Sequence, residues 1–405
     1  SGTEFSYDMK ALAMVFYPEK ECRVVEHPEV STEDGYSIKW QMDGKKWEKL
    51  FPNPYTKNQI KKEVYEYLKT KSGKELPWGI LTGIRPAKIP LRLMMQGQEE
   101  AAIWDILKEE YFCRDDKVKL AMDVAKKEFS LTQGMQHERC ANVYIGIPFC
   151  PTICAYCSFS SFPAGRYRDK MDAYLDALEK EMTQCKEWLA GKQMVSVYVG
   201  GGTPTSLSEE QFERLMAMTE KYLPMEQSKE FTVEAGRPDS ITEGKLRSMK
   251  THGVTRISIN PQSMKEHTLE LLGRKHTVEE IREKFMLART LGFDNINMDL
   301  IAGLPEETLE DFKETLREVE ALKPDSITVH TLVIKRASRL RKEQLEQGGE
   351  MREEDACIEP MQKEAEQFCR VHGYEPYYMY RQKNKAHTTR NTNQENVAYA
   401  KPGKE

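Results

Sequence analysis

The sequence predicts an α/β protein whose main part is an incomplete (β/α)6 TIM-like barrel, preceded by an α+β accessory domain. Two observations lead to this fold class. From residue 139 onward, apolar runs rich in Val and Ile alternate with amphipathic stretches, as expected for parallel strands that are buried on both faces. Polar residues recur just after these runs, which favours a barrel, because its strand ends converge at one mouth. The periodicity alone would also fit a Rossmann-like sheet.

The predicted strands share a near-continuous apolar character and cover residues 143–149, 195–199, 231–235, 256–260, 296–301 and 326–332. The helices that are expected after the first five strands cover residues 170–189, 209–222, 242–251, 278–290 and 309–322. Two of these helix starts carry a capping-box pattern, Ser208 with Gln211 and Thr277 with Glu280, in which side chains satisfy free backbone N–H groups.

Three parts are expected along the chain: an α+β accessory domain at residues 1–138, the barrel at 139–335, and a C-terminal extension at 336–405 that is expected to be incomplete. The accessory domain has a hairpin pattern at residues 36–42 and 46–50, with Asp43-Gly44 as its turn. Helical patterns follow at 59–69, 87–95, 100–110 and 116–129, and a Gly- and Pro-punctuated connector lies at 78–86. In the extension, the aromatic stretch 374–381 is interpreted as a packed strand rather than as a face for a tetrapyrrole.

Composition excludes several classes of protein. The chain has 405 residues, of which 31% are charged, and a mean hydropathy of −0.67. No apolar run reaches the length of a membrane span. The formal net charge of −5 argues against nucleic-acid binding by bulk electrostatics. The nine cysteines are scattered along the chain, the six outside residues 150–157 show no paired spacing, and no secretory signal precedes them, which is typical of reduced thiols in the cytoplasm.

One loop carries the strongest chemical signal. Cys150, Cys154 and Cys157 follow the first predicted strand with C-x3-C-x2-C spacing. Three thiolates on so short a loop can bind one soft metal centre, and a cubane held by only three leaves one iron open for chemistry. A disulfide with a spare thiol is disfavoured by the cytosolic cysteine usage. A structural zinc site stays an alternative, although no histidine lies within ten positions after Cys157. We therefore predict a 4Fe–4S cluster.

Polar groups follow the other predicted strands. Their positions are Gly200-Gly201-Gly202-Thr203-Pro204, Glu234, Asn260-Pro261-Gln262, Arg274 and Asp299. Each alone would be interpreted as a tight turn or a solvated strand end. Together, at one end of successive strands and beside a cysteine loop, they fit a ligand with both charges, a sulfur and a ribose, which is S-adenosylmethionine (SAM).

The same motifs carry a resemblance to a known family. The cysteine spacing and the Gly200–Pro204 motif resemble those of the radical SAM superfamily. Residues 144–150, 199–205, 256–263 and 297–305 resemble oxygen-independent (anaerobic) coproporphyrinogen III dehydrogenases. The accessory domain, through residues 78–86, resembles the Z-type branch of that family. The resemblance covers about residues 141–335 and implies a barrel of the radical SAM type.

The resemblance also implies roles for individual residues. Cys150, Cys154 and Cys157 would hold the cluster, and Tyr144 would stand between cofactor and substrate. The SAM contacts would be Gly201, Gly202 and Thr203 to its amino acid part, Gln262 and Arg274 to its carboxylate or ribose, and Glu234 and Asp299 to its ribose hydroxyls or amino group. Arginine suits a carboxylate because its planar fork binds both oxygens.

The implied activity is oxidative decarboxylation of the propionates of coproporphyrinogen III to protoporphyrinogen IX, with an electron donor such as flavodoxin or ferredoxin. Lys335, Arg336 and Arg339 are candidate propionate contacts, although a solvated basic turn is the simpler interpretation. Two positions depart from the family's oxidising members: Phe159 stands where they carry a fourth cysteine, and Gly146 where they carry histidine. These departures favour an alternative, a haem-binding or haem-transfer protein that keeps the cluster. A radical SAM enzyme acting on another tetrapyrrole is a further alternative.

Overall fold

The structure is a computed structural model, and it describes residues 3–17, 20–23, 25, 35–42, 45–334, 338–346, 357–382 and 395–405. The chain divides into two compact units. The first comprises residues 1–131 and 379–395, and the second comprises 132–378 and 396–405. The stretch after residue 335 is therefore shared between both units.

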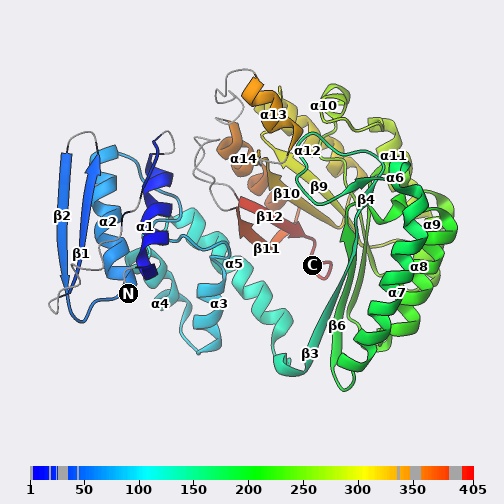
Figure 1. The fold of residues 1–405 in the computed structure, drawn as a ribbon, viewed down its shortest axis with the longest axis horizontal. Helices are drawn as coiled ribbons and strands as arrows, with labels where there is room; N and C mark the ends of the chain where they lie inside the picture. Colours follow the sequence, from blue (N-terminus) through cyan, green and yellow to red (C-terminus); the bar gives the residue numbers. More distant parts are fainter. Residues whose placement is uncertain are drawn as a thin grey trace. The chain divides into compact units, whose positions relative to one another are not determined.

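The first unit contains a helix, a β-hairpin and a group of further helices (Figure 1). Its elements are α1 (Thr3–Phe16), β1 (Gly35–Met42), β2 (Lys45–Pro52), α2 (Lys57–Ser72), α3 (Lys88–Met95), α4 (Glu100–Asp105) and α5 (Asp115–Thr132). The predicted hairpin is present, with Trp40 opposite Trp47 in the antiparallel register. The predicted turn at Asp43-Gly44 lies outside the described residues. The predicted helix at 100–110 is α4 followed by a π-helical turn, Ile106–Glu110.

The core of this unit is built where α1 meets α2. Leu12 and Phe16 of α1 pack with Ile60 and Leu68 of α2, and all four are buried. Helix α2 starts at a capping box formed by Thr56 and Gln59, which satisfies N–H groups that would otherwise lack partners.

The second unit is built on a curled sheet (Figure 1). Six parallel strands follow one another in space as in the sequence: β3 (Cys140–Ile147), β6 (Gln193–Gly201), β7 (Glu230–Gly236), β8 (Arg256–Ile259), β9 (Ile296–Ala302) and β10 (Ser326–Thr331). These are the predicted strands, so the prediction of an incomplete barrel is confirmed. Beyond β10 the sheet continues through β12 (Glu395–Ala400), which is antiparallel to β10, to β11 (Glu375–Arg381). The predicted strand at 374–381 is thus β11.

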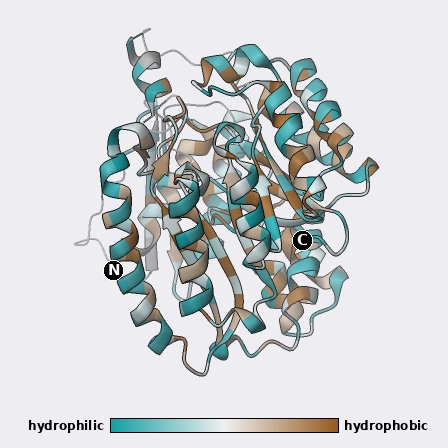
Figure 2. Cartoon of the chain, turned by 90° about the vertical axis from the view of Figure 1, so that its right-hand side faces the viewer, coloured by the Kyte–Doolittle hydropathy of each residue, from teal (hydrophilic) through white to brown (hydrophobic). Residues whose placement is uncertain are grey.

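Helices cover the outer face of this sheet. They are α6 (Ala164–Tyr167), α7 (Met171–Trp188), α8 (Glu209–Tyr222), α9 (Glu243–Thr251), α10 (Glu266–Leu271), α11 (Val278–Thr290), α12 (Leu309–Leu322), α13 (Arg339–Glu346) and α14 (Ile358–Val371). Figure 2 shows that their polar residues lie mainly on the outside and their apolar residues toward the strands. Both predicted capping boxes form, at α8 and α11, and a third one starts α12. Among the described residues, no helix is long and apolar enough to cross a membrane.

Candidate cofactor site

The three cysteines lie together in the loop that follows β3. Cys150 ends the short strand β4 (Phe149–Cys150), and all three cysteines are partly buried and outside any disulfide. Neighbouring segments fix the loop: Ala155 N donates to Leu272 O (2.9 Å) and Thr152 Oγ1 donates to Gly273 O (3.1 Å). Because Leu272 and Gly273 come from the segment after β8, the cysteine loop is anchored to the far side of the barrel mouth.

The glycine run at the end of β6 packs directly against the first cysteine. Gly202 N donates to Ile147 O and Thr203 N donates to Phe149 O, each at 2.7 Å. Thr203 Oγ1 lies 3.6 Å from Cys150 Sγ. A Cβ on Gly202 would stand 2.5 Å from Phe149 O and 3.0 Å from Cys150 Sγ. This position therefore needs a glycine because of close approach, whereas Gly201 needs one because of its φ of +110°.

Two arginines approach the second cysteine. Nη1 of Arg274 and Nη1 of Arg237 each lie 3.9 Å from Cys154 Sγ. Arg237 is buried and its guanidinium binds Asp239 through two hydrogen bonds, Nε to Oδ1 at 3.0 Å and Nη2 to Oδ2 at 2.7 Å. Arg237 is a residue that sequence reasoning missed. The only local signal was an arginine directly after a buried strand, two positions before an aspartate.

The Asp239 carboxylate also lies 3.7 Å from His276 Nδ1. Burial would raise the pKa of Asp239, but the nearby His276 ring and the two hydrogen bonds from Arg237 outweigh burial and hold the pKa well below the usual value. The ionised Asp239 therefore fixes the guanidinium of Arg237 beside the cysteine loop. Positive charge held in this way stabilises thiolates and the anionic cluster that they would bind.

The surroundings of the thiols fit an iron–sulfur cluster. There is no room for a side chain at position 202, so the backbone of Gly202 lies directly against Cys150. Burial raises the pKa of the Cys150 thiol, while the nearby Thr203 hydroxyl acts in the opposite direction. Within the described ranges, no three His, Cys, Asp or Glu side chains are already gathered at metal-binding geometry.

On the inner face of the sheet, aromatic residues meet a carboxylate. Tyr144 of β3 stacks on Tyr198 of β6, with ring centroids 5.8 Å apart and an interplanar angle of 14°. The Tyr198 hydroxyl donates to Glu234 Oε1 of β7 at 2.5 Å. Loss of water raises the pKa of Glu234 to about 7, although the Tyr198 hydrogen bond opposes this shift. Glu234 is thus poised to change protonation near neutral pH, and an ammonium group beside it would keep it ionised.

The second predicted carboxylate has its own partners. Asp299 of β9 accepts from Asn297 Nδ2 at 2.7 Å and lies 3.7 Å from His330 Nε2 of β10. Burial would raise the pKa of Asp299, but the contacts to His330 and Asn297 lower it below the usual value. Glu234 and Asp299 therefore differ in protonation at neutral pH: Asp299 is held ionised, whereas the pKa of Glu234 lies near 7.

The other predicted residues lie as follows. Gln262 has a φ of +70° and is buried, and its backbone continues the pairing of β8 with β9, with Gln262 N donating to Asp299 O at 2.9 Å. Arg274 Nη2 donates to Asn260 O at 2.5 Å. Arg339 Nη2 donates to Leu271 O at 3.3 Å, which supports a structural role. Lys335 and Arg336 lie outside the described residues.

The two departures from the family pattern lie near the loop. Phe159 is 71% exposed. A Cβ on Gly146 would meet only Tyr144 Cε1, at 3.5 Å, within a 4 Å radius. The Gly146 position thus has room for a side chain, unlike Gly202.

Comparison with known proteins agrees with this geometry. Residues 144–319 match the Radical SAM superfamily. The chain is 40% identical over 353 residues to the oxygen-independent coproporphyrinogen-III oxidase-like protein HemZ of Bacillus subtilis, covering 86% of this chain and 69% of the relative. It is 38% identical to the heme chaperone HemW of the same organism, over 48% of this chain and 50% of that one.

Among solved structures, the chain is similar to coproporphyrinogen III oxidase (HemN) from Escherichia coli, with a TM-score of 0.51 and 27% identity. The match covers 66% of this chain and 56% of the other. The chain thus spans only about half the length of the heme chaperone and of this oxidase. The superfamily uses a 4Fe–4S cluster and SAM. The chain belongs to the radical SAM superfamily and, within it, to the family of oxygen-independent coproporphyrinogen-III oxidase-like proteins.

Proposed function

We propose that the protein is a radical SAM enzyme of haem metabolism that decarboxylates the propionates of coproporphyrinogen III oxidatively, giving protoporphyrinogen IX. The observation that carries the proposal is the contact between the glycine run and the cysteine loop, at Gly202 and Cys150. It brings the predicted SAM contacts and the predicted cluster ligands to one place. The names of the relatives support the substrate class.

Each residue then has a specific task. Cys150, Cys154 and Cys157 hold the cluster, and Gly202 with Thr203 offers backbone groups to the amino acid part of SAM. With an electron from an external donor such as flavodoxin or ferredoxin, the bound cluster and SAM would supply the radical chemistry that removes a hydrogen atom from the substrate.

The inner face of the sheet positions the ligands. Glu234 binds the amino group of SAM, and Tyr198 fixes the carboxylate through the 2.5 Å hydrogen bond. Gln262 and Arg274 bind the carboxylate or ribose of SAM, and Asp299, held ionised, binds the ribose. Tyr144, which is 62% exposed, covers the position between cofactor and substrate. Loss of carbon dioxide from the propionate leaves a vinyl group and passes one electron to an external acceptor.

A second function is favoured by Phe159 and Gly146. The exposed Phe159 offers an apolar ring where a fourth cysteine would stand, and the open space at Gly146 lacks a histidine. A protein that binds haem and transfers it, while keeping the cluster, fits these two positions. The 38% identity to a heme chaperone supports this alternative.

One experiment separates the two functions. The chain is reconstituted with iron and sulfide without oxygen, then incubated with reductant, SAM and coproporphyrinogen III. Formation of 5′-deoxyadenosine and protoporphyrinogen IX supports the enzyme. Stoichiometric haem binding without protoporphyrinogen supports the transfer protein. Cys154→Ala should abolish cluster absorbance, whereas Cys185→Ala, a partly buried cysteine in α7, should retain it. Full iron content in Cys154→Ala would refute the ligand assignment.

A further inference from the structure

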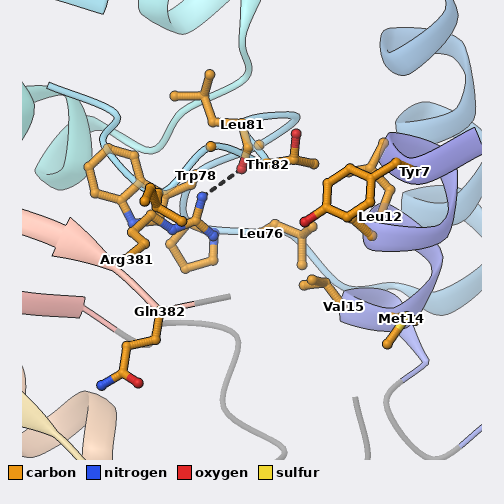
Figure 3. A pocket seen from close by; sticks show the side chains of 15 residues that line it. Tyr7, Leu12, Met14, Val15, Leu76, Trp78, Leu81, Thr82, Arg381 and Gln382 are labelled. Carbon is orange, nitrogen blue, oxygen red and sulfur yellow. Dashed lines mark hydrogen bonds between the residues drawn. The ribbon is translucent and has the colours of Figure 1, made fainter. Parts of the chain in front are cut away.

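A cavity lies within the first unit, lined by α1, by the connector that contains residues 76–84, and by the end of β11 (Figure 3). About 60 Å³ of it is accessible to the centre of a water-sized molecule, and its empty space, including the part that is open to solvent, is about 640 Å³. Most of its wall is apolar, with Leu12 and Val15 from α1 and Leu76 and Leu81 from the connector. The cluster loop belongs to the other compact unit, so this cavity is separate from the proposed cofactor site.

One cation reaches this cavity. The Arg381 guanidinium lies over the Trp78 ring, 5.6 Å from its centroid. Its Nη1 donates to Leu81 O at 2.6 Å, and its Nε has no hydrogen-bond partner and almost no exposed surface. Within the part of the chain that the structure describes, Arg381 forms no ion pair. A ligand cannot reach Nε, because Nε has almost no exposed surface, but Nη2 has no acceptor among the described residues and can donate to a carboxylate.

The neighbouring carboxylate is already used. Glu395 Oε1 accepts from Trp78 Nε1 at 2.5 Å, and Glu395 Oε2 accepts from Lys117 Nζ at 2.9 Å. The negative charge of Glu395 therefore compensates the positive charge of Lys117 first, and that of Arg381 only to a lesser extent. Burial lowers the pKa of Arg381, which reflects the cost of keeping this charge away from water. Buried charges are normally paired, so the position favours an anion from outside the chain.

A second cationic group stands close to the same wall. Thr82, which lines the cavity, accepts from Lys61 Nζ at 3.0 Å and donates to Asp8 Oδ1 at 2.5 Å. Asp8 is shared between Lys61 and Lys57, with Lys57 Nζ at 2.5 Å. Two lysines on one aspartate leave excess positive charge next to Arg381, which adds to the attraction of an anion.

We propose that this cavity binds an apolar molecule through its carboxylate, with the carboxylate on Arg381 and the apolar body along the wall of leucines and Trp78. Figure 3 shows Tyr7 and Arg381 on opposite sides of Leu76, so a ligand on the arginine would extend toward α1. Two classes of molecule carry this chemistry: fatty acids, and tetrapyrroles with propionate side chains. Binding of a tetrapyrrole would link the first unit to the proposed function, but the proposed site does not depend on that function.

The test is calorimetric titration of the full chain with decanoate and, separately, with coproporphyrin III. Decanol is the matched neutral probe. Binding of decanoate but not decanol assigns the site to fatty acids, and binding of coproporphyrin III alone assigns it to propionates. Binding of neither acid, or equal binding of decanol and decanoate, overturns the proposal.

Variants locate the binding. Arg381→Gln should weaken binding of the acid by about 10- to 100-fold, as expected when a charge-assisted hydrogen bond is lost. Ala11→Phe should fill the cavity from α1 and abolish binding. Arg92→Gln, on the exposed face of α3, is the matched control and should bind as the parent does. Unchanged binding in both Arg381→Gln and Ala11→Phe would overturn the proposal. Iron content after reconstitution should be equal in all of these proteins, which keeps the result separate from the proposed catalysis.

Discussion

Replacement of Gly202 by alanine tests whether the contact between β6 and the cysteine loop creates the cofactor site. The added methyl carbon would stand 2.5 Å from Phe149 O, 2.9 Å from Ile147 O and 3.0 Å from Cys150 Sγ. Two of these neighbours are backbone atoms, which cannot rotate away as the end of a flexible side chain can. The strand end and the loop must therefore move apart.

The magnitude follows from the contacts that are lost. Separation stretches the hydrogen bonds from Gly202 N to Ile147 O and from Thr203 N to Phe149 O, both 2.7 Å long. Each contributes about 0.5–1.5 kcal/mol net, and forced overpacking costs about 1–3 kcal/mol. We expect the free energy of unfolding to fall by about 2–6 kcal/mol and the cluster to be lost, because Cys150 is displaced.

The assay is iron and sulfide content after anaerobic reconstitution, together with urea unfolding of the apoprotein. Gly146→Ala is the matched control, because its new methyl group would meet only Tyr144, at 3.5 Å. It should retain the cluster and change stability by less than about 1 kcal/mol. A Gly202→Ala variant with full iron content and parental stability would refute the reasoning.

Three further predictions concern the charged groups of the site. The pKa of Glu234 in the fold, about 7, lies above its unfolded value of 4.5, so the folded state binds the extra proton and loses stability as pH rises from about 4.5 to 7, by up to about 3 kcal/mol. Urea unfolding of apo Glu234→Gln at pH 5 and pH 8 should lack this loss, and an unchanged pH dependence would contradict it. Tyr198→Phe removes a hydrogen bond that lowers the pKa of Glu234. The pH at which SAM binding is half-maximal, measured by calorimetry, should therefore rise, and a fall in this pH would exclude this role. Arg237→Gln removes a positive charge 3.9 Å from Cys154 Sγ, so the midpoint potential of the cluster in an EPR-monitored titration should become more negative, and an unchanged potential would rule out this influence.

Local signals in the sequence were sufficient to locate the six parallel strands and the five helices that were predicted in the second unit. Helices α8, α11 and α12 begin and end where the sequence predicts, because capping residues and amphipathic periodicity act within a few positions. The parallel strands lie where the sequence predicts them, because their near-continuous apolar character reflects burial on both faces, but β3, β6 and β7 differ from the predicted bounds.

Contacts between distant segments could not be predicted in this way. The approach of Arg237 to Cys154 depends on how the end of β7 meets the cysteine loop, 83 positions away in the chain. The pairing of Tyr198 with Glu234 likewise depends on the register between β6 and β7. The antiparallel strand β12 carries no periodic signal of its own, and its place beside β10 is decided by tertiary contacts.

Glu395 has a consequence for how the protein is made. It belongs to the same compact unit as residues 1–131, where it joins Trp78 to Lys117. On the ribosome, the first unit must therefore wait until residue 395 has been synthesised before the salt bridge between Lys117 and Glu395 can close. A fragment cut after residue 131 would leave the Lys117 ammonium buried without its acid, so residues 1–131 and 379–395 have to mature together.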